Sequence, residues 1–186
     1  MRIDAIWRPD VQQQIYRRLL DAYARPGTLQ MAKELCGGYM AWVGVLSTLL
    51  DGQTTLADPH SLLDPDYWAL LQSRRDTPEK AMFVLCDGSG KPDFEPALGS
   101  LESPEEGATL VIRVESLGEG EEIDLSGPGI PGDRTLAVTG LDDGWIEARS
   151  SWVAAFPLGV DWILADDENF IALPRTTRIN MTLKVE

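Results

Sequence analysis

Apolar side chains recur at helical spacing near the start of the chain, with polar residues between them. The apolar positions are Val11, Ile15, Leu19, Leu20 and Tyr23. Because they fall on one face at 3.6 residues per turn, they predict an amphipathic surface helix. Pro9 suits its first turn, and Pro26 with Gly27 ends it. Residues 38–50 are apolar on every side and predict a buried helix.

Short apolar runs bounded by turn residues predict strands in the rest of the chain. These runs are residues 54–57, 81–86, 108–114, 123–125, 136–138, 160–165 and 170–173. Two further helices are predicted at residues 62–74 and 146–155. Residues 87–107 are rich in Gly, Pro and acids, which predicts a mobile loop with one helical turn at 96–98.

The order of these elements predicts how the strands pair. Strand and helix alternate early in the chain, which is typical of parallel neighbours. Later, residues 108–114 and 123–125 predict a hairpin joined by residues 117–122, three of which are Glu, with 136–138 as an edge element. A turn at 166–169 joins the last two strands. We therefore expect an α/β fold, a single domain over residues 1–186 with a mixed β-sheet flanked by helices.

Charge and cysteine usage narrow the possible partners and compartment. Thirty acidic and 16 basic side chains give a formal net charge of -14, which repels nucleic acid and anionic membranes. A solvated acidic surface explains this charge, and a basic protein partner is the alternative. The longest apolar stretch, residues 39–50, is too short to span a membrane. Cys36 and Cys86 form no CxxC motif and fit a reducing cytoplasm.

The chain carries few of the residues on which common catalytic sites depend. His60 is the only histidine, and no GxSxG motif accompanies it, so we expect a surface or capping role for it. Histidine-rich and CxxC zinc sites are excluded by the same counts, and we predict no metal site, although carboxylates could hold Mg²⁺. The sequence also lacks both standard glycine motifs for nucleotide phosphates.

Two segments are candidates for binding an anion. Residues 126–132 are rich in Gly and Pro; we expect a tight loop there, because the prolines lack the N–H donors of an anion nest. The segment from Arg175 to Arg178 is the better candidate, since guanidiniums bind oxyanions bidentately and hydroxyls add donors. The proposed binding residues are Arg175, Thr176, Thr177, Arg178 and Asp161. The favoured alternative is an internal ion pair between one arginine and Asp161 or the acidic turn.

Several short motifs agree, in their order and spacing along the chain, with those of a known protein family. They are residues 16–20 with 26–27, residues 107–110, residues 125–130, and the tail residues 156–161 with 173–177. Together they span nearly the whole chain, and the sequence resembles the PhnH family, a subunit of the carbon-phosphorus lyase system. Residues 87–104 and the acidic residues Glu119, Glu121 and Glu122 depart from the resemblance.

The resemblance implies a cytoplasmic bacterial protein that works in alkylphosphonate use. It implies a core complex with PhnG, PhnI and PhnJ, and a homodimer in isolation. With PhnG, PhnI and PhnL, such a subunit supports formation of ribose 1-alkylphosphonate 5-triphosphate from ATP, in an assembly or co-catalytic role. The implied fold is a reduced pyridoxal-phosphate transferase domain without cofactor, and none of the lysines has a recognisable Schiff-base setting. A stand-alone phosphate- or phosphonate-binding transferase or binding module is the alternative.

Overall fold

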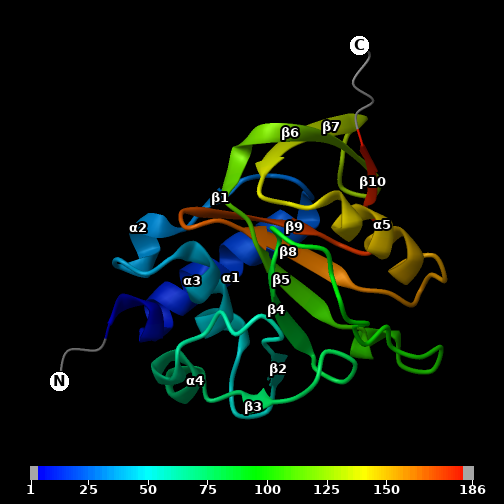
Figure 1. Ribbon diagram of the computed structural model, residues 1–186. Helices are drawn as coiled ribbons and strands as arrows, with labels where there is room; N and C mark the ends of the chain where they lie inside the picture. Colours follow the sequence, from blue (N-terminus) through cyan, green and yellow to red (C-terminus); the bar gives the residue numbers. More distant parts are fainter. Residues whose placement is uncertain (1–3, 182–186) are drawn as a thin grey trace.

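The computed structural model describes residues 4–181, which form two β-sheets and a set of short helices (Figure 1). Within these residues the main sheet has seven strands in the order β1-β9-β8-β5-β4-β2-β3. Its strands are β1 (Gln30–Met31), β2 (Thr55–Ala57), β3 (Arg74–Arg75), β4 (Phe83–Asp87), β5 (Thr109–Arg113), β8 (Asp161–Ala165) and β9 (Asn169–Leu173). A smaller sheet has the order β10-β6-β7, with β6 (Ser116–Ser126), β7 (Asp133–Thr139) and β10 (Arg178–Met181).

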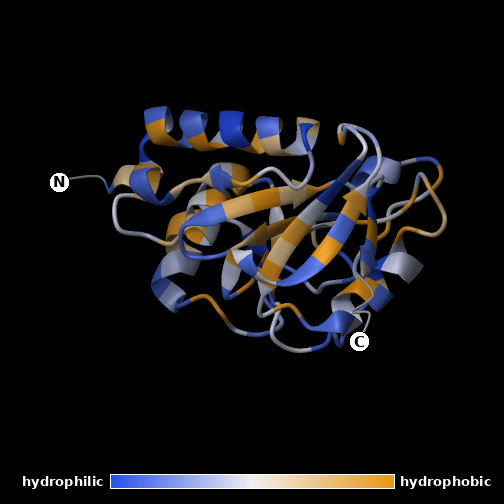
Figure 2. Ribbon diagram, turned by 90° about the horizontal axis from the view of Figure 1, so that it is seen from above, coloured by the Kyte–Doolittle hydropathy of each residue, from blue (hydrophilic) through white to orange (hydrophobic). Residues whose placement is uncertain are grey.

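The helices cover the main sheet on both faces. They are α1 (Pro9–Ala24), α2 (Lys33–Cys36), α3 (Ala41–Leu49), α4 (Pro65–Leu71) and α5 (Asp143–Trp152), with short 3-10 turns at η1 (Ala5–Trp7) and η2 (Pro104–Glu106). Side chains of a strand alternate between faces. Accordingly, Val111 packs in the core under α1 and α3, whereas Leu110 packs in the core under α5 and the small sheet. Hydrophilic and hydrophobic positions alternate along α1 in Figure 2, as its single buried face requires.

The α/β fold with a mixed sheet is confirmed. Strands β3, β2, β4, β5 and β8 run parallel, while β9 and β1 add antiparallel pairs at one side. The helices predicted near the start of the chain are present as α1 and α3. On α1, however, Ala22 is buried and Leu20 is exposed, because Ala22 follows Leu19 by three residues along the same face.

The predicted hairpin of residues 108–114 and 123–125 is wrong. Strand β5 lies in the middle of the main sheet between β4 and β8, whereas residues 123–125 belong to β6 of the small sheet. The Glu-rich residues 117–122 are part of β6 and not a connection, and the pairing register with β7 shifts between Leu117 and Glu121. The edge element predicted at 136–138 is the edge strand β7, and it is longer than predicted.

Two further predictions about helices need correction. The helix predicted at 62–74 is only α4, because Gln72 adopts a left-handed φ of 57° and ends it. Arg74 and Arg75 form β3, and the Arg75 guanidinium stacks 4.1 Å from the Trp68 ring centroid. The helical turn predicted at 96–98 is absent; a 3-10 turn lies at Pro104–Glu106 instead.

The long segment between β4 and β5 packs against α5, although its composition predicts a mobile loop. Phe94 stacks on Trp152, and the Trp152 indole N–H donates to the Glu95 carboxylate at 2.7 Å. The Trp145 indole N–H donates to the Gly90 carbonyl at 2.7 Å. No helix among residues 4–181 is both long and apolar enough to cross a membrane.

Candidate functional site

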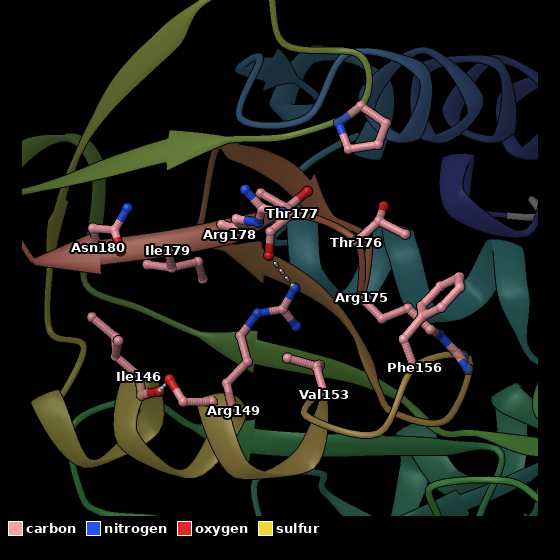
Figure 3. A pocket seen from close by; sticks show the side chains of 12 residues that line it. Ile146, Arg149, Val153, Phe156, Arg175, Thr176, Thr177, Arg178, Ile179 and Asn180 are labelled. Carbon is pink, nitrogen blue, oxygen red and sulfur yellow. Dashed lines mark hydrogen bonds between the residues drawn. The ribbon is translucent and has the colours of Figure 1, made fainter.

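A pocket of about 550 Å³ lies between α5 and β10 (Figure 3). It is the place where the predicted site residues come together. Its lining residues are Pro128, Ile146, Arg149, Ser150, Val153, Phe156, Arg175, Thr176, Thr177, Arg178, Ile179 and Asn180. Four of the five predicted residues are among them. The fifth, Asp161, does not line the pocket but forms an ion pair with Arg175.

Arg149 is the central side chain of the pocket, and it is not among the residues that the sequence predicts for the site (Figure 3). It is only 2% exposed, and its guanidinium lies 4.9 Å from the Trp162 ring centroid. Its Nη1 donates to the Val160 carbonyl at 3.1 Å, and its Nη2 to the carbonyls of Pro174 at 2.6 Å and Thr177 at 3.3 Å. Burial lowers the pKa of Arg149 to about 10, so the side chain remains charged at neutral pH.

Through these hydrogen bonds Arg149 positions neighbouring elements of the fold, in addition to placing a positive charge in the pocket. One side chain of α5 joins the start of β8, the end of β9 and the residue before β10 through backbone carbonyls. Carbonyls that leave a sheet at a turn need donors when they are buried. Arg149 supplies those donors and thereby holds α5 against the start of β8 and the end of β9.

Arg175 forms the ion pair with Asp161 that the alternative interpretation predicted. Its Nη2 lies 2.8 Å from Asp161 Oδ2, and its backbone N–H donates to Asp161 Oδ1 at 2.7 Å. Its Nη1 donates to the carbonyls of Pro104 at 2.8 Å and Pro157 at 3.1 Å. Asp161 begins β8 and both side chains are largely buried, so Arg175 links the strand start to two connecting segments.

The three residues after Arg175 differ in accessibility. Thr176 is exposed, whereas Thr177 is 2% exposed and its Oγ1 has no hydrogen-bond partner among the described residues. Arg178 and Asn180 are exposed, while Ile179 packs against the core. Since side chains alternate along β10, Arg178 lies on the outer face, across from Ser126 of β6. Arg178 therefore contributes charge at the rim of the pocket.

The charge of the pocket differs from that of the whole chain. Its lining contains three arginines and no Asp, Glu, His or Cys, in a protein of net charge -14. Asp161 compensates Arg175, but no salt bridge to Arg149 or Arg178 occurs within residues 4–181. The pocket thus combines local positive charge with apolar side chains of α5 and β10. Its lining offers no nucleophile paired with a base, and the predicted anion-binding role of its residues stays a prediction.

The other candidate residues lie elsewhere. His60 accepts a hydrogen bond from the Asp87 backbone N–H through Nδ1 at 2.8 Å, so it caps the end of β4. Residues 126–132 form the tight connection between β6 and β7, where Gly129 has a φ of 82° and a Cβ atom would lie 2.6 Å from the Ala24 carbonyl. In the described part of the chain no three metal-ligating side chains cluster.

No local signal in the sequence could have identified Arg149. It stands in a helical segment between Ala148 and Ser150, where an arginine is an ordinary surface residue. Its burial results from carbonyls that are 11 to 28 residues away along the chain. A buried arginine of this kind becomes visible only when the fold is known.

Comparison with known proteins identifies the family. The model of the PhnH family, described as bacterial phosphonate metabolism protein, matches residues 5–180. The chain belongs to the PhnH family. The match covers α1, α5 and both sheets, and the resemblance found in the sequence is therefore confirmed.

Two curated relatives extend this finding. The putative C-P lyase subunit protein HtxG of Stutzerimonas stutzeri is 44% identical over 176 residues, which covers 95% of this chain and 89% of the relative. The second relative is the alpha-D-ribose 1-methylphosphonate 5-triphosphate synthase subunit PhnH of Rhizobium meliloti (strain 1021). It is 31% identical over 178 residues, which covers 90% of this chain and 89% of the relative. The chain therefore spans nearly the full length of both relatives.

Proposed function

We propose that the protein is a subunit of a carbon-phosphorus lyase system for alkylphosphonate use. In this role it assembles with PhnG, PhnI and PhnJ, and with PhnG, PhnI and PhnL it supports formation of ribose 1-alkylphosphonate 5-triphosphate from ATP and alkylphosphonate. The observation that carries the proposal is the likeness, over 89% of their length, to two relatives named as subunits of such systems.

The composition of the pocket supports an assembly or co-catalytic role. Its lining has no side chain of the types that usually act as general base or covalent nucleophile at neutral pH, apart from hydroxyls that no base activates. Arg149 and Arg175 donate mainly to backbone carbonyls and to Asp161, which are structural partners. We therefore assign the chemistry of the system to the assembled complex.

Reconstitution tests this proposal directly. The protein should convert no ATP and methylphosphonate alone, co-purify with PhnG, PhnI and PhnJ, and be needed for product formation by the mixed subunits with PhnL. Phosphorus NMR would detect the ribosyl phosphonate product. Turnover by the isolated protein would contradict the assembly role, and a complex equally active without it would contradict the proposal as a whole.

Several finer features belong to the same proposal. We infer a cytoplasmic protein that forms a homodimer in isolation, and a fold related to a reduced pyridoxal-phosphate transferase domain without the cofactor. Light scattering after size-exclusion chromatography would give the mass of the isolated species. Incubation with pyridoxal phosphate followed by dialysis should leave no cofactor absorbance, and retained absorbance would contradict this inference.

A stand-alone phosphate- or phosphonate-binding protein is the second candidate, favoured by the three arginines and missing carboxylates of the pocket. Arg175→Ala separates the two ideas. Because the substitution leaves the largely buried Asp161 without its cation, we expect a loss of about 2–3 kcal/mol in the free energy of unfolding and no effect on ligand binding. Thr176→Ala, exposed beside it, is the matched control. Calorimetry with methylphosphonate, phosphate and ATP supplies the binding readout; binding that Arg175→Ala abolishes would favour the second candidate.

A further inference from the structure

Strand β10 has an open pairing edge in the described part of the chain. It forms an outer strand of the small sheet, where β6 pairs with one of its sides and no strand within residues 4–181 pairs with the other. In an antiparallel pair only alternate residues exchange hydrogen bonds, so about half of the N–H and C=O groups of β10 face away from β6. Such a row of backbone groups is a template for another strand.

The open edge lies beside a groove of suitable length. Figure 3 shows α5 and β10 running side by side, with the lining side chains between them. The lining from Ile146 of α5 to Val153 directly after the helix covers roughly 10 Å at 1.5 Å per residue. The four residues of β10 cover about 13 Å. The groove can therefore hold about four residues of an extended segment.

The groove offers apolar surface together with positive charge. Ile146, Val153 and Ile179 line it, and Phe156 stands at one end with 67% of its surface exposed. The guanidinium of Arg149 lies in its wall and no carboxylate opposes it there. An acidic segment would be attracted here and repelled by most of the remaining surface, since the chain carries 30 acidic against 16 basic side chains.

A small oxyanion suits this groove less well than an extended segment. Arg149 is 2% exposed, and its Nη atoms already donate to carbonyls. Arg175 is bound to Asp161, and Arg178 lies on the outer face of β10. The donors that remain beside the groove are the backbone groups of β10 and the Thr177 hydroxyl, and these fit an extended main chain.

We propose that the groove between α5 and β10 binds an extended acidic segment of a partner subunit, which adds to the open edge of β10 as a strand. The inference rests on the proposed function, because the partner is another subunit of the same complex. The pocket then serves assembly of the complex, and its occupant is an extended, acidic stretch of main chain. Backbone hydrogen bonds supply affinity, and the apolar wall of α5 favours apolar side chains. The exposed Arg178 at the rim and the positive potential of the buried Arg149 favour acidic side chains, without a direct contact to Arg149.

Blocking the groove from α5 tests this proposal. Ser150 is exposed and lines the groove, so Ser150→Trp fills it without disturbing the core. Ser151→Trp is the matched control, because Ser151 is equally an exposed serine of α5 but lies outside the groove lining. In a pull-down with the other subunits, we expect Ser150→Trp to weaken association at least tenfold and Ser151→Trp to change it less than threefold. Equal association of the two variants would overturn the proposal.

Hydrogen exchange identifies the occupant. In the complex, alternate backbone amides of residues 178–181 should exchange at least tenfold more slowly than in the isolated protein, and Ser150→Trp should remove this protection. Unchanged exchange of β10 in an intact complex would overturn the inference while leaving the proposed function in place. The same protection with inorganic phosphate or methylphosphonate alone would assign the groove to a small anion. Failure of the wild-type protein to form any complex would overturn both proposals.

Discussion

Replacing Arg149 by methionine gives the sharpest test of how α5 is held against the ends of β8 and β9. Methionine keeps a flexible apolar stem of similar length but has no donors. Two of the contacts it removes have good geometry, at 3.1 Å to Val160 and 2.6 Å to Pro174. The others, at 3.3 and 3.4 Å, are marginal. The substitution therefore leaves two buried carbonyls without a firm donor.

The magnitude follows from those two carbonyls. A buried acceptor that loses its donor costs about 1–3 kcal/mol, and removal of a buried charge recovers part of that loss. We expect a net loss of about 3 kcal/mol in the free energy of unfolding, a large part of the roughly 5–15 kcal/mol of a typical domain. For a chain of 186 residues this corresponds to a fall in Tm of about 6–12 °C.

Urea denaturation followed by circular dichroism measures the effect, with Arg178→Met as the control. Arg178 is exposed, so its replacement should change stability by less than about 0.5 kcal/mol. Arg149→Lys keeps the charge but not the planar fork, and it should resemble Arg149→Met more than the wild type. If Arg149→Met were as stable as Arg178→Met, the carbonyl contacts would not be what holds α5 in place.

Four further predictions concern other parts of the fold. A Cβ atom on Gly107 would lie 2.2 Å from the Gly159 carbonyl oxygen, so Gly107→Ala should lower the free energy of unfolding by about 1–3 kcal/mol, and unchanged urea stability would contradict this. Burial raises the pKa of Cys36 to about 11 and that of Cys86 well above its usual value, so both thiols should react with a disulfide reagent at pH 8 only after unfolding. Because the pKa of Cys36 is raised in the folded protein, the contribution of its protonated thiol to the free energy of unfolding should decline from about pH 9 to 11. Phe94→Ala should expose residues 88–107 to limited proteolysis, and an unchanged cleavage pattern would show that its ring packing does not order that segment.

The sequence predicts where helices and strands lie better than it predicts which strands pair with one another. Periodicity identifies α1 and the strand pair β8–β9, because each depends on contacts within one short segment. The error at residues 108–125 is of another kind. An apolar run does not state which run it pairs with, and β5 and β6 are neighbours along the chain that belong to different sheets. The acidic residues of β6 led to the incorrect prediction of a connection at residues 117–122, because a strand of a small exposed sheet tolerates charge that a buried strand excludes.

For the candidate site, too, the sequence identifies residues but not the contacts that they make. Residues 175–178 could be found from their side-chain chemistry, and they do line a pocket. Their local roles could not be found, because Arg175 is engaged by Asp161 and strand alternation turns Arg178 outward. Arg149 was missed for a related reason: its importance comes from four carbonyls on segments far from it in the chain.

The open edge of β10 also bears on how the isolated protein behaves at high concentration. Unpaired strand edges promote aggregation, and here the edge lies beside apolar side chains of α5. The net charge of -14 opposes that outcome, since copies of the chain repel one another. This repulsion is screened over about 10 Å at 0.1 M salt. Colloidal stability of the free subunit should therefore decrease with ionic strength, and low-salt buffers are the conditions in which the free subunit aggregates least.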